Sequence, residues 1–396
     1  MMNLFPLKYV AYLSLVLFLG ACAGLPVNGM VDGQALDTRV DSEVARYYVE
    51  NYLAGKRTDA VLDKRIDQVY ENANGDLPNR DDLKKLSDEF SVDFAALYLA
   101  DKIAHVPANR RFRHDFDQEV EYVRTARSDG ELKLPSAAAN YEIMFVPTYL
   151  YKRITMTGAD MSVPRAALEK AGFPCTFVET QDDGGIEANA NVVVAAIRAR
   201  AHSGRRLIIV SASKSGPEVA LALTRMKPAE TAHVAAWINT VGALQGTPLI
   251  DDHVLPEIEF IVGKVDPAGP ESLSVARSRP RFQSFHVPKH IFVVNYFGIP
   301  TIGSISFLAS RGYFPLRKKY GPNDGLVLLP DMIFPGGVTV FQLGSDHIKL
   351  NDHIEVNSVA LAITVVEWVE NKNHPLPSAP QNPLMDGTRR DAFPTQ

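Results

Sequence analysis

The residues best suited to chemistry lie at 211–216, Ser-Ala-Ser-Lys-Ser-Gly, directly after the apolar run at 207–210. The run predicts a buried strand, and Pro217 suits the first turn of a helix at about 217–226. A serine between a strand and a helix, with small residues two positions away on each side, is typical of an exposed nucleophile. Ser213 is therefore the first candidate, with Ser211 and Ser215 as alternatives.

A serine hydroxyl is a weak nucleophile unless a base takes its proton and an acid orients that base. Asp324 lies in an Asn-Asp-Gly turn, and His347 follows 23 positions later. His347 stands between an expected strand at 338–343 and an expected helix at 353–369. His353 is the second choice for the base, whereas Asp346 is too near His347 in the chain to orient its ring.

These three segments, in this order, resemble the α/β-hydrolase family. The segment around Ser213 resembles the family's nucleophile elbow, although serines stand where glycines are usual. The Asn-Asp-Gly-Leu-Val run at 323–327 resembles the segment that bears the catalytic acid in bacterial true lipases. The resemblance covers about residues 135–372 and implies a Ser213–His347–Asp324 triad. It implies cleavage of carboxylic esters, as in esterases and lipases, through an acyl-enzyme and without a cofactor or metal.

The resemblance also implies an oxyanion site made of two backbone N–H groups. The residue after the nucleophile, Lys214, supplies one of them through its amide. By position, the second donor is the amide of Tyr149, with the amide of Thr148 as its competitor. Pro147 and Thr148 stand where the family has a His-Gly pair.

The elements that must position these residues begin at Tyr141. Apolar strand candidates alternate there with helical segments, which predicts an α/β domain over 135–372 with a mostly parallel sheet and helices on both faces. The stretches 245–288 and 300–320 interrupt this rhythm. Both are too long for simple connections, so they are candidate cap insertions over an active site.

The residues before this domain divide into three parts. Residues 41–130 have helical spacing and predict a small helical region, with Asp41 as the cap of its first helix. Residues 22–40 show no periodicity and are interpreted as a tether. At the other end, residues 373–396 are interpreted as a Pro-rich tail.

Residues 1–21 have the pattern of a targeting segment. The apolar run ends in Leu-Gly-Ala-Cys at 19–22, which resembles a bacterial lipobox and implies a signal peptide removed before a lipid-linked Cys22. Ala23 resembles the pattern of outer-membrane sorting, so we expect a lipid-anchored protein of the bacterial envelope. Cys175 lies in an expected buried strand and is interpreted as a small apolar side chain.

Composition excludes several other functions. The net charge of −5 over 396 residues offers no broad attraction for nucleic acid. The sequence has no H-E-x-x-H zinc motif, no phosphate loop and no G-x-G-x-x-G dinucleotide motif. The two resemblances imply an ester as partner, including lipid or fatty-acyl esters, and a membrane. The alternative is a non-catalytic envelope lipoprotein that uses a hydrolase-like scaffold for binding, because the elbow lacks its usual glycines.

Overall fold

Six parallel strands form the central sheet of the computed structural model, which describes residues 24–73, 75–130, 132–252, 264–351 and 353–371. The strand order is β4-β3-β5-β6-β7-β8, and each neighbouring pair is parallel. The prediction of a mostly parallel sheet is confirmed. The strands are β3 (Tyr141–Val146), β4 (Cys175–Phe177), β5 (Arg206–Ala212), β6 (Val234–Thr240), β7 (Phe292–Ile299) and β8 (Val338–Leu343).

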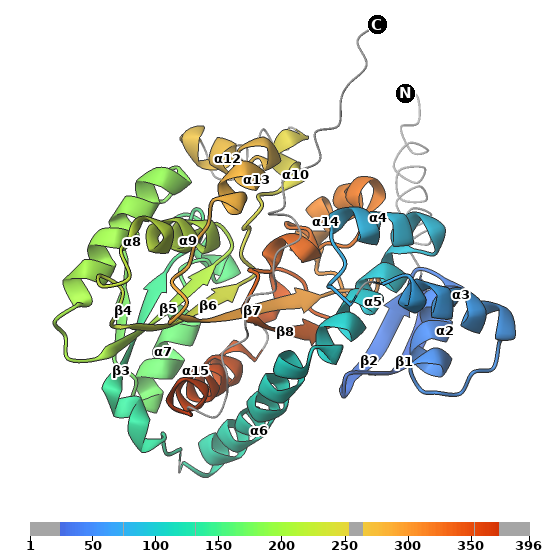
Figure 1. The fold of residues 1–396 in the computed structure, drawn as a ribbon, viewed down its shortest axis with the longest axis horizontal. Coiled ribbons are helices and arrows are strands. Elements are labelled where there is room, and N and C mark those ends of the chain that lie inside the picture. The colour runs from blue at the N-terminus through green and yellow to red at the C-terminus, as the bar shows by residue number, and fades with distance from the viewer. Residues whose placement is uncertain (1–23, 74, 131, 253–263, 352, 372–396) are drawn as a thin grey trace, which may run out of the picture.

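Helices cover both faces of this sheet (Figure 1). Helices α8 (Ile186–Arg200) and α9 (Ser215–Arg225) pack together on one face. Helices α6 (Pro107–Asp129), α7 (Ser162–Ala171) and α15 (Ile354–Glu370) cover the other. Every residue of β3 and β7 is buried, as expected for strands with helices on both sides.

Both candidate cap stretches contain helices. Helices α10 (Pro248–Asp251), α12 (Ala268–Ser272) and α13 (Val275–Gln283) lie between β6 and β7. Helix α14 (Phe307–Tyr320) lies between β7 and β8. Short 3-10 turns complete the domain at η2 (Ser136–Asn140), η3 (Thr155–Thr157), η4 (Leu329–Met332) and η5 (Lys349–Asn351).

The N-terminal region contains α2 (Glu43–Tyr47), a π-helical turn η1 (Tyr48–Tyr52), α3 (Ala60–Glu71), α4 (Arg80–Glu89) and α5 (Val92–His105). The cap of α2 is Ser42, whose side chain accepts the N–H of Ala45, so the prediction of Asp41 as the cap is wrong. The Asp41 carboxylate instead pairs with Arg317 and accepts the N–H of Asp93. Asp41 therefore links this region to α14 rather than capping a helix.

The interpretation of residues 22–40 as a tether is wrong for its described part. Strands β1 (Leu25–Val31) and β2 (Gln34–Val40) form an antiparallel hairpin. Its turn is Asp32-Gly33, with both φ angles positive (49° and 73°), which is the strongest short sequence signal for a hairpin. The hairpin buries Val27, Val31, Leu36 and Val40.

The hairpin and α6 also cover the open edge of β8. The Gln34 side-chain amide donates to the carbonyl of Phe341 at 3.2 Å and accepts the N–H of Leu343 at 2.9 Å. From α6, Arg113 donates to the same carbonyl, and Asn109 accepts the N–H of Thr339. An uncovered edge strand invites pairing with another chain, so these side chains protect the sheet.

The predicted signal peptide (1–21), the lipidation site Cys22 and the tail (373–396) lie outside the described residues. Among the helices that are described, none is long and apolar enough to cross a membrane.

Candidate active site

Ser213 occupies a sharp turn between β5 and α9. Its φ angle is +54°, a left-handed conformation that costs energy for a residue with a side chain. The turn is held because the Ser213 N–H donates to the Thr240 carbonyl, while the Ser213 carbonyl accepts the N–H groups of Gly216 and Ala243, each at 3.0 Å. The side chain remains partly exposed and lines a cavity.

The two alternative serines are buried and serve the scaffold. Ser211 Oγ accepts the indole N–H of Trp237 at 2.8 Å. Ser215 Oγ donates to the carbonyl of Val146 at 2.7 Å and accepts the N–H of Ala212 at 2.8 Å. Ser215 thus joins the ends of β3 and β5, which a glycine at this position would not do.

Asp324 and His347 form a hydrogen-bonded pair. Asp324 Oδ2 lies 2.6 Å from His347 Nδ1, and the His347 N–H donates to the Asp324 carbonyl at 2.9 Å. Asp324 Oδ1 accepts the N–H groups of Leu326 and Val327. Because the carboxylate is fully buried and held by its own turn, it fixes the orientation of the imidazole.

The rival residues have other roles. Asp346 Oδ1 accepts the N–H groups of Ile348 and Lys349, and its Oδ2 accepts that of Ser306. Asp346 therefore builds the loop that carries His347 without bonding to the ring. His353 is exposed in front of α15 and lies outside the cavity lining.

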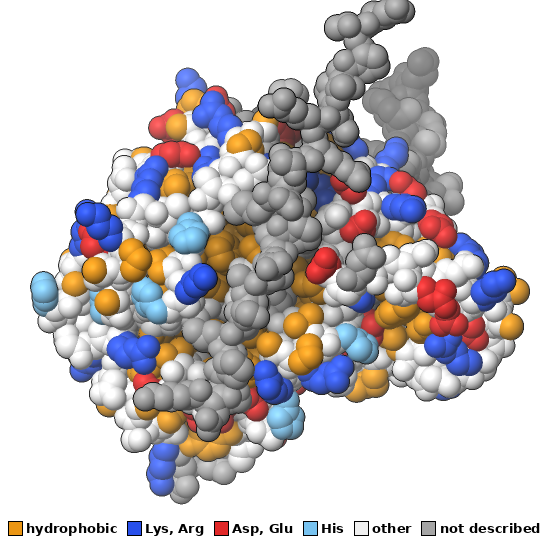
Figure 2. Space-filling model, viewed as in Figure 1, with side chains coloured by type: hydrophobic (Ala, Val, Ile, Leu, Met, Phe, Trp, Pro, Cys, Tyr) orange, Lys and Arg blue, Asp and Glu red, His pale blue; other side chains and the backbone are white. Residues whose placement is uncertain are grey.

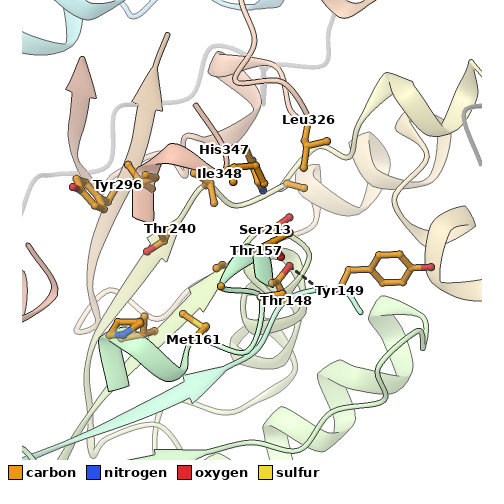
Figure 3. A pocket seen from close by; sticks show the side chains of 18 of the residues that line it. Thr148, Tyr149, Thr157, Met161, Ser213, Thr240, Tyr296, Leu326, His347 and Ile348 are labelled. Atoms are coloured by element: carbon orange, nitrogen blue, oxygen red, sulfur yellow. Dashed lines mark hydrogen bonds between the residues drawn. The ribbon is translucent and has the colours of Figure 1, made fainter. Parts of the chain in front are cut away.

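Ser213 and His347 line the same cavity, and both side chains reach into it in Figure 3. Among the described residues, no hydrogen bond joins Ser213 Oγ to the ring of His347. The structure thus brings Asp324 and His347 together directly and places Ser213 beside them in one cavity.

The two expected oxyanion segments also meet at this cavity, which Thr148 and Tyr149 line. The Lys214 amide, at the start of α9, has no acceptor in the described part of the chain. The other two amides already have acceptors, because the Tyr149 N–H donates to Thr148 Oγ1 at 2.6 Å and the Thr148 N–H donates to the Ala159 carbonyl at 3.3 Å.

A buried ion pair below the elbow was not predicted from the sequence. The Lys214 ammonium bonds to Glu218, and both side chains are at most 2% exposed. Glu218 also accepts from the Asn189 side chain at 2.9 Å, and burial raises its pKa although Lys214 opposes this. The spacing of four residues on a helix was the available signal. The Lys214 side chain is thus committed to the scaffold, leaving only its amide for chemistry.

The cavity measures about 430 Å³ and is lined mainly by apolar side chains. The helices of the two candidate cap stretches contribute Leu249 and Ile250 from α10, Pro270 from α12 and Leu308 from α14. Figure 2 shows hydrophobic side chains gathered near the middle of one face of the molecule. A pocket of this size and polarity suits an apolar ligand with few hydrogen-bonding groups.

Cys175 lies at the start of β4 and is a free thiol. Burial raises its pKa to about 12, so it is protonated at neutral pH and a poor nucleophile. In the described ranges, no group of three or more His, Cys, Asp and Glu side chains is arranged to hold a metal ion.

Neither a protein-family model nor a curated protein matches this sequence. The chain is similar to a solved metagenomic carboxyl esterase, with 22% identity, coverage of 60% of this chain and 77% of that chain, and a TM-score of 0.49. Bacillus licheniformis lipase BlEst2 in mature form is 20% identical, with coverage of 57% of this chain and 90% of that chain and a TM-score of 0.46. Phospholipase PlaB from Legionella pneumophila is 15% identical, with coverage of 49% of this chain and 45% of that chain and a TM-score of 0.37. The parallel sheet and the strained strand-to-helix turn define an α/β-hydrolase fold.

Proposed function

We propose that the protein is a serine hydrolase that cleaves carboxylic esters. The observation that carries this proposal is the buried Asp324–His347 pair, which faces the same apolar cavity as the strained Ser213 turn. A buried carboxylate that orients a histidine beside an accessible serine is the arrangement needed to activate a hydroxyl.

In the proposed reaction, Ser213 Oγ attacks the ester carbonyl while His347 Nε2 takes the hydroxyl proton. Asp324 accepts the Nδ1–H and stabilises the imidazolium that forms. The bond to the alcohol oxygen then breaks, and His347 returns the proton to the leaving alcohol. Water, activated by the same histidine, attacks the acyl-enzyme and releases the acid.

For the oxyanion we propose the Lys214 amide as one donor, because it has no acceptor among the described residues and adjoins the nucleophile. The Tyr149 amide is the proposed second donor. It must then exchange its acceptor, Thr148 Oγ1, for the substrate oxygen. The neighbouring Thr148 amide is the competing donor.

The experiment is hydrolysis of p-nitrophenyl butyrate by the purified chain lacking residues 1–21. Ser213→Ala is expected to lower kcat by about 10⁴-fold or more. Ser211→Ala is the matched control, because Ser211 lies two residues away and its hydroxyl bonds, in the described part of the chain, to the Trp237 indole alone. Equal activity of Ser213→Ala and wild type contradicts the role of Ser213. A folded wild type that cleaves no ester favours the binding-protein alternative.

We also propose that the enzyme is anchored in the bacterial envelope through lipid on Cys22, in the outer membrane. Several acyl chains on one cysteine anchor a protein stably, since each buried CH₂ contributes about 0.8 kcal/mol. The proposal predicts that the full chain sediments with membranes and that Cys22→Ser releases it. Lipid anchoring through Cys22 is contradicted if Cys22→Ser stays with the membranes and is not labelled by a fatty-acid analogue.

A further inference from the structure

The cavity beside Ser213 extends well below the carboxyl edge of the sheet. Its floor is one face of the strands, where Phe145 and Ile143 are alternate residues of β3. The matching pairs are Ala212 and Val210 on β5 and Thr240 and Ile238 on β6. Alternation by two places all these side chains on the same side of the sheet, below the turn that carries Ser213.

The opposite wall belongs to α7 and α15. Helix α7 contributes Pro164 and Leu168, and α15 contributes residues on one face of the helix. From Ile354 to Ala362 the lining extends for about 12 Å at about 1.5 Å per residue. The α15 residues are Ile354, Asn357, Ser358, Leu361 and Ala362.

This arm of the cavity is closed at its far end. The strands run toward Ser213, whereas the helices that follow them in a parallel sheet run back, so Ile143, Leu168 and Ala362 are the deepest lining residues. Each of these three is at most 1% exposed. The other end opens under the cap, where Leu308 lines the cavity and is 53% exposed.

The lining also indicates the chemistry of the ligand. Among the described lining residues there is no Asp, Glu, Lys or Arg, and His347 is the sole histidine. A phosphate or carboxylate in the closed arm would lose its hydration without gaining a cation. A hydrocarbon chain gains about 0.8 kcal/mol for each CH₂ that it buries there.

We propose that the closed arm between the sheet and helices α7 and α15 binds the unbranched acyl chain of an uncharged ester. This inference rests on the proposed ester hydrolysis. When Ser213 Oγ bonds to the acyl carbon, the bond to the alcohol oxygen breaks and that oxygen takes the proton from His347. The alcohol leaves first, so it must lie toward the open end. The acyl group stays bound to Ser213 and fits the arm that has no exit.

The test is the ratio of kcat/KM for p-nitrophenyl decanoate to that for p-nitrophenyl butyrate. For the wild type, kcat/KM rises by up to about fourfold for each CH₂ that enters the arm, which is 0.8 kcal/mol converted to a rate. Ala362→Phe fills the closed end and is expected to lower the ratio at least tenfold. Leu361→Ala enlarges the same end and moves the optimum toward palmitate.

Val366→Ala is the matched control, because Val366 is buried on α15 but does not line the cavity. Its ratio is expected to equal that of the wild type. Thermal melting establishes that each variant is folded. Ratios for Ala362→Phe and Leu361→Ala that both match the wild type overturn the inference while leaving ester hydrolysis intact.

A second readout does not depend on activity. Dodecanol, an uncharged chain, is titrated into the protein by calorimetry. If dodecanol binds to the wild type and binds at least tenfold more weakly to Ala362→Phe, the arm is supported as a site for a hydrocarbon chain, even if no ester is cleaved. Absence of binding to the wild type, or equal binding to both proteins, overturns it. Failure of the proposed hydrolysis and failure of the acyl site are therefore distinguishable.

Discussion

Replacing Asp324 with asparagine tests how the carboxylate controls His347. In the structure, Asp324 Oδ1 accepts the N–H groups of Leu326 and Val327, while Oδ2 faces His347 Nδ1 at 2.6 Å. Asparagine keeps the two backbone bonds if its oxygen takes the place of Oδ1. Its NH₂ group must then face Nδ1, which becomes an acceptor and places the ring proton on Nε2.

With the proton on Nε2, His347 cannot accept the hydroxyl proton of Ser213. The wrong tautomer in a Ser-His-Asp site lowers kcat by about 10⁴-fold, or about 5 kcal/mol of transition-state stabilisation. Because the turn is preserved, we expect the melting temperature of Asp324→Asn to remain near that of the wild type. The assay is steady-state hydrolysis of p-nitrophenyl butyrate.

Asp346→Asn is the matched control. Asp346 is equally buried, adjoins His347 and accepts three backbone N–H groups, but it does not bond to the ring. We expect a loss of about 1–3 kcal/mol in stability and less than a tenfold change in kcat. Folded Asp324→Asn that retains kcat within tenfold of the wild type, or an equal loss of activity in both variants, refutes this role of the Asp324 carboxylate.

Three further predictions concern the scaffold. Gly216→Ala is expected to destabilise the protein by about 1–3 kcal/mol in urea unfolding, because its Cβ would lie 2.7 Å from Asn239 Oδ1 and 2.9 Å from the Gly242 Cα; unchanged stability contradicts this. Glu218→Gln leaves the Lys214 ammonium buried without a counter-charge and is expected to lower the free energy of unfolding by about 3–5 kcal/mol in the same measurement. If the loss is smaller than that caused by replacing an exposed glutamate with glutamine, the pair is not buried in solution. Burial, reinforced by the nearby Asp41 carboxylate, raises the pKa of Asp93 from its ordinary 3.8 to about 7. The folded state therefore binds more protons than the unfolded state between these values, and its stability falls as pH rises through them. Asp93→Asn should remove this decline, and parallel pH–stability curves for the two proteins contradict the assignment.

Most of the central sheet was predictable because strands such as β3 and β7 are buried throughout and form apolar runs, whereas β4 is short and half-buried. Ser213 was predictable from the strand-to-helix turn, although its usual glycines are absent. The structure explains their replacement, since the Ser215 hydroxyl binds the ends of two strands and Gly216 provides the close contact one residue later. A sequence motif specifies residue types alone, so it does not show that Ser215 and Gly216 together replace the usual glycine.

Other features depend on contacts between residues far apart in the chain. The Asp32-Gly33 turn is a hairpin signal, but the polar residues on either side of it obscure the strand pattern. The role of Gln34 at the edge of β8 depends on a residue more than 300 positions away. The closed cavity arm likewise arises only when α7 and α15 pack on the sheet, so no local pattern predicts it.

Labelling of the purified chain with a fluorophosphonate, followed by peptide mass mapping, tests most directly whether Ser213 is an activated nucleophile. An activated serine reacts without requiring knowledge of the natural substrate. We predict one adduct, on the peptide that contains Ser213, and its loss in His347→Ala. Folded wild-type protein that shows no adduct, or an adduct on another residue that persists in Ser213→Ala, contradicts the account.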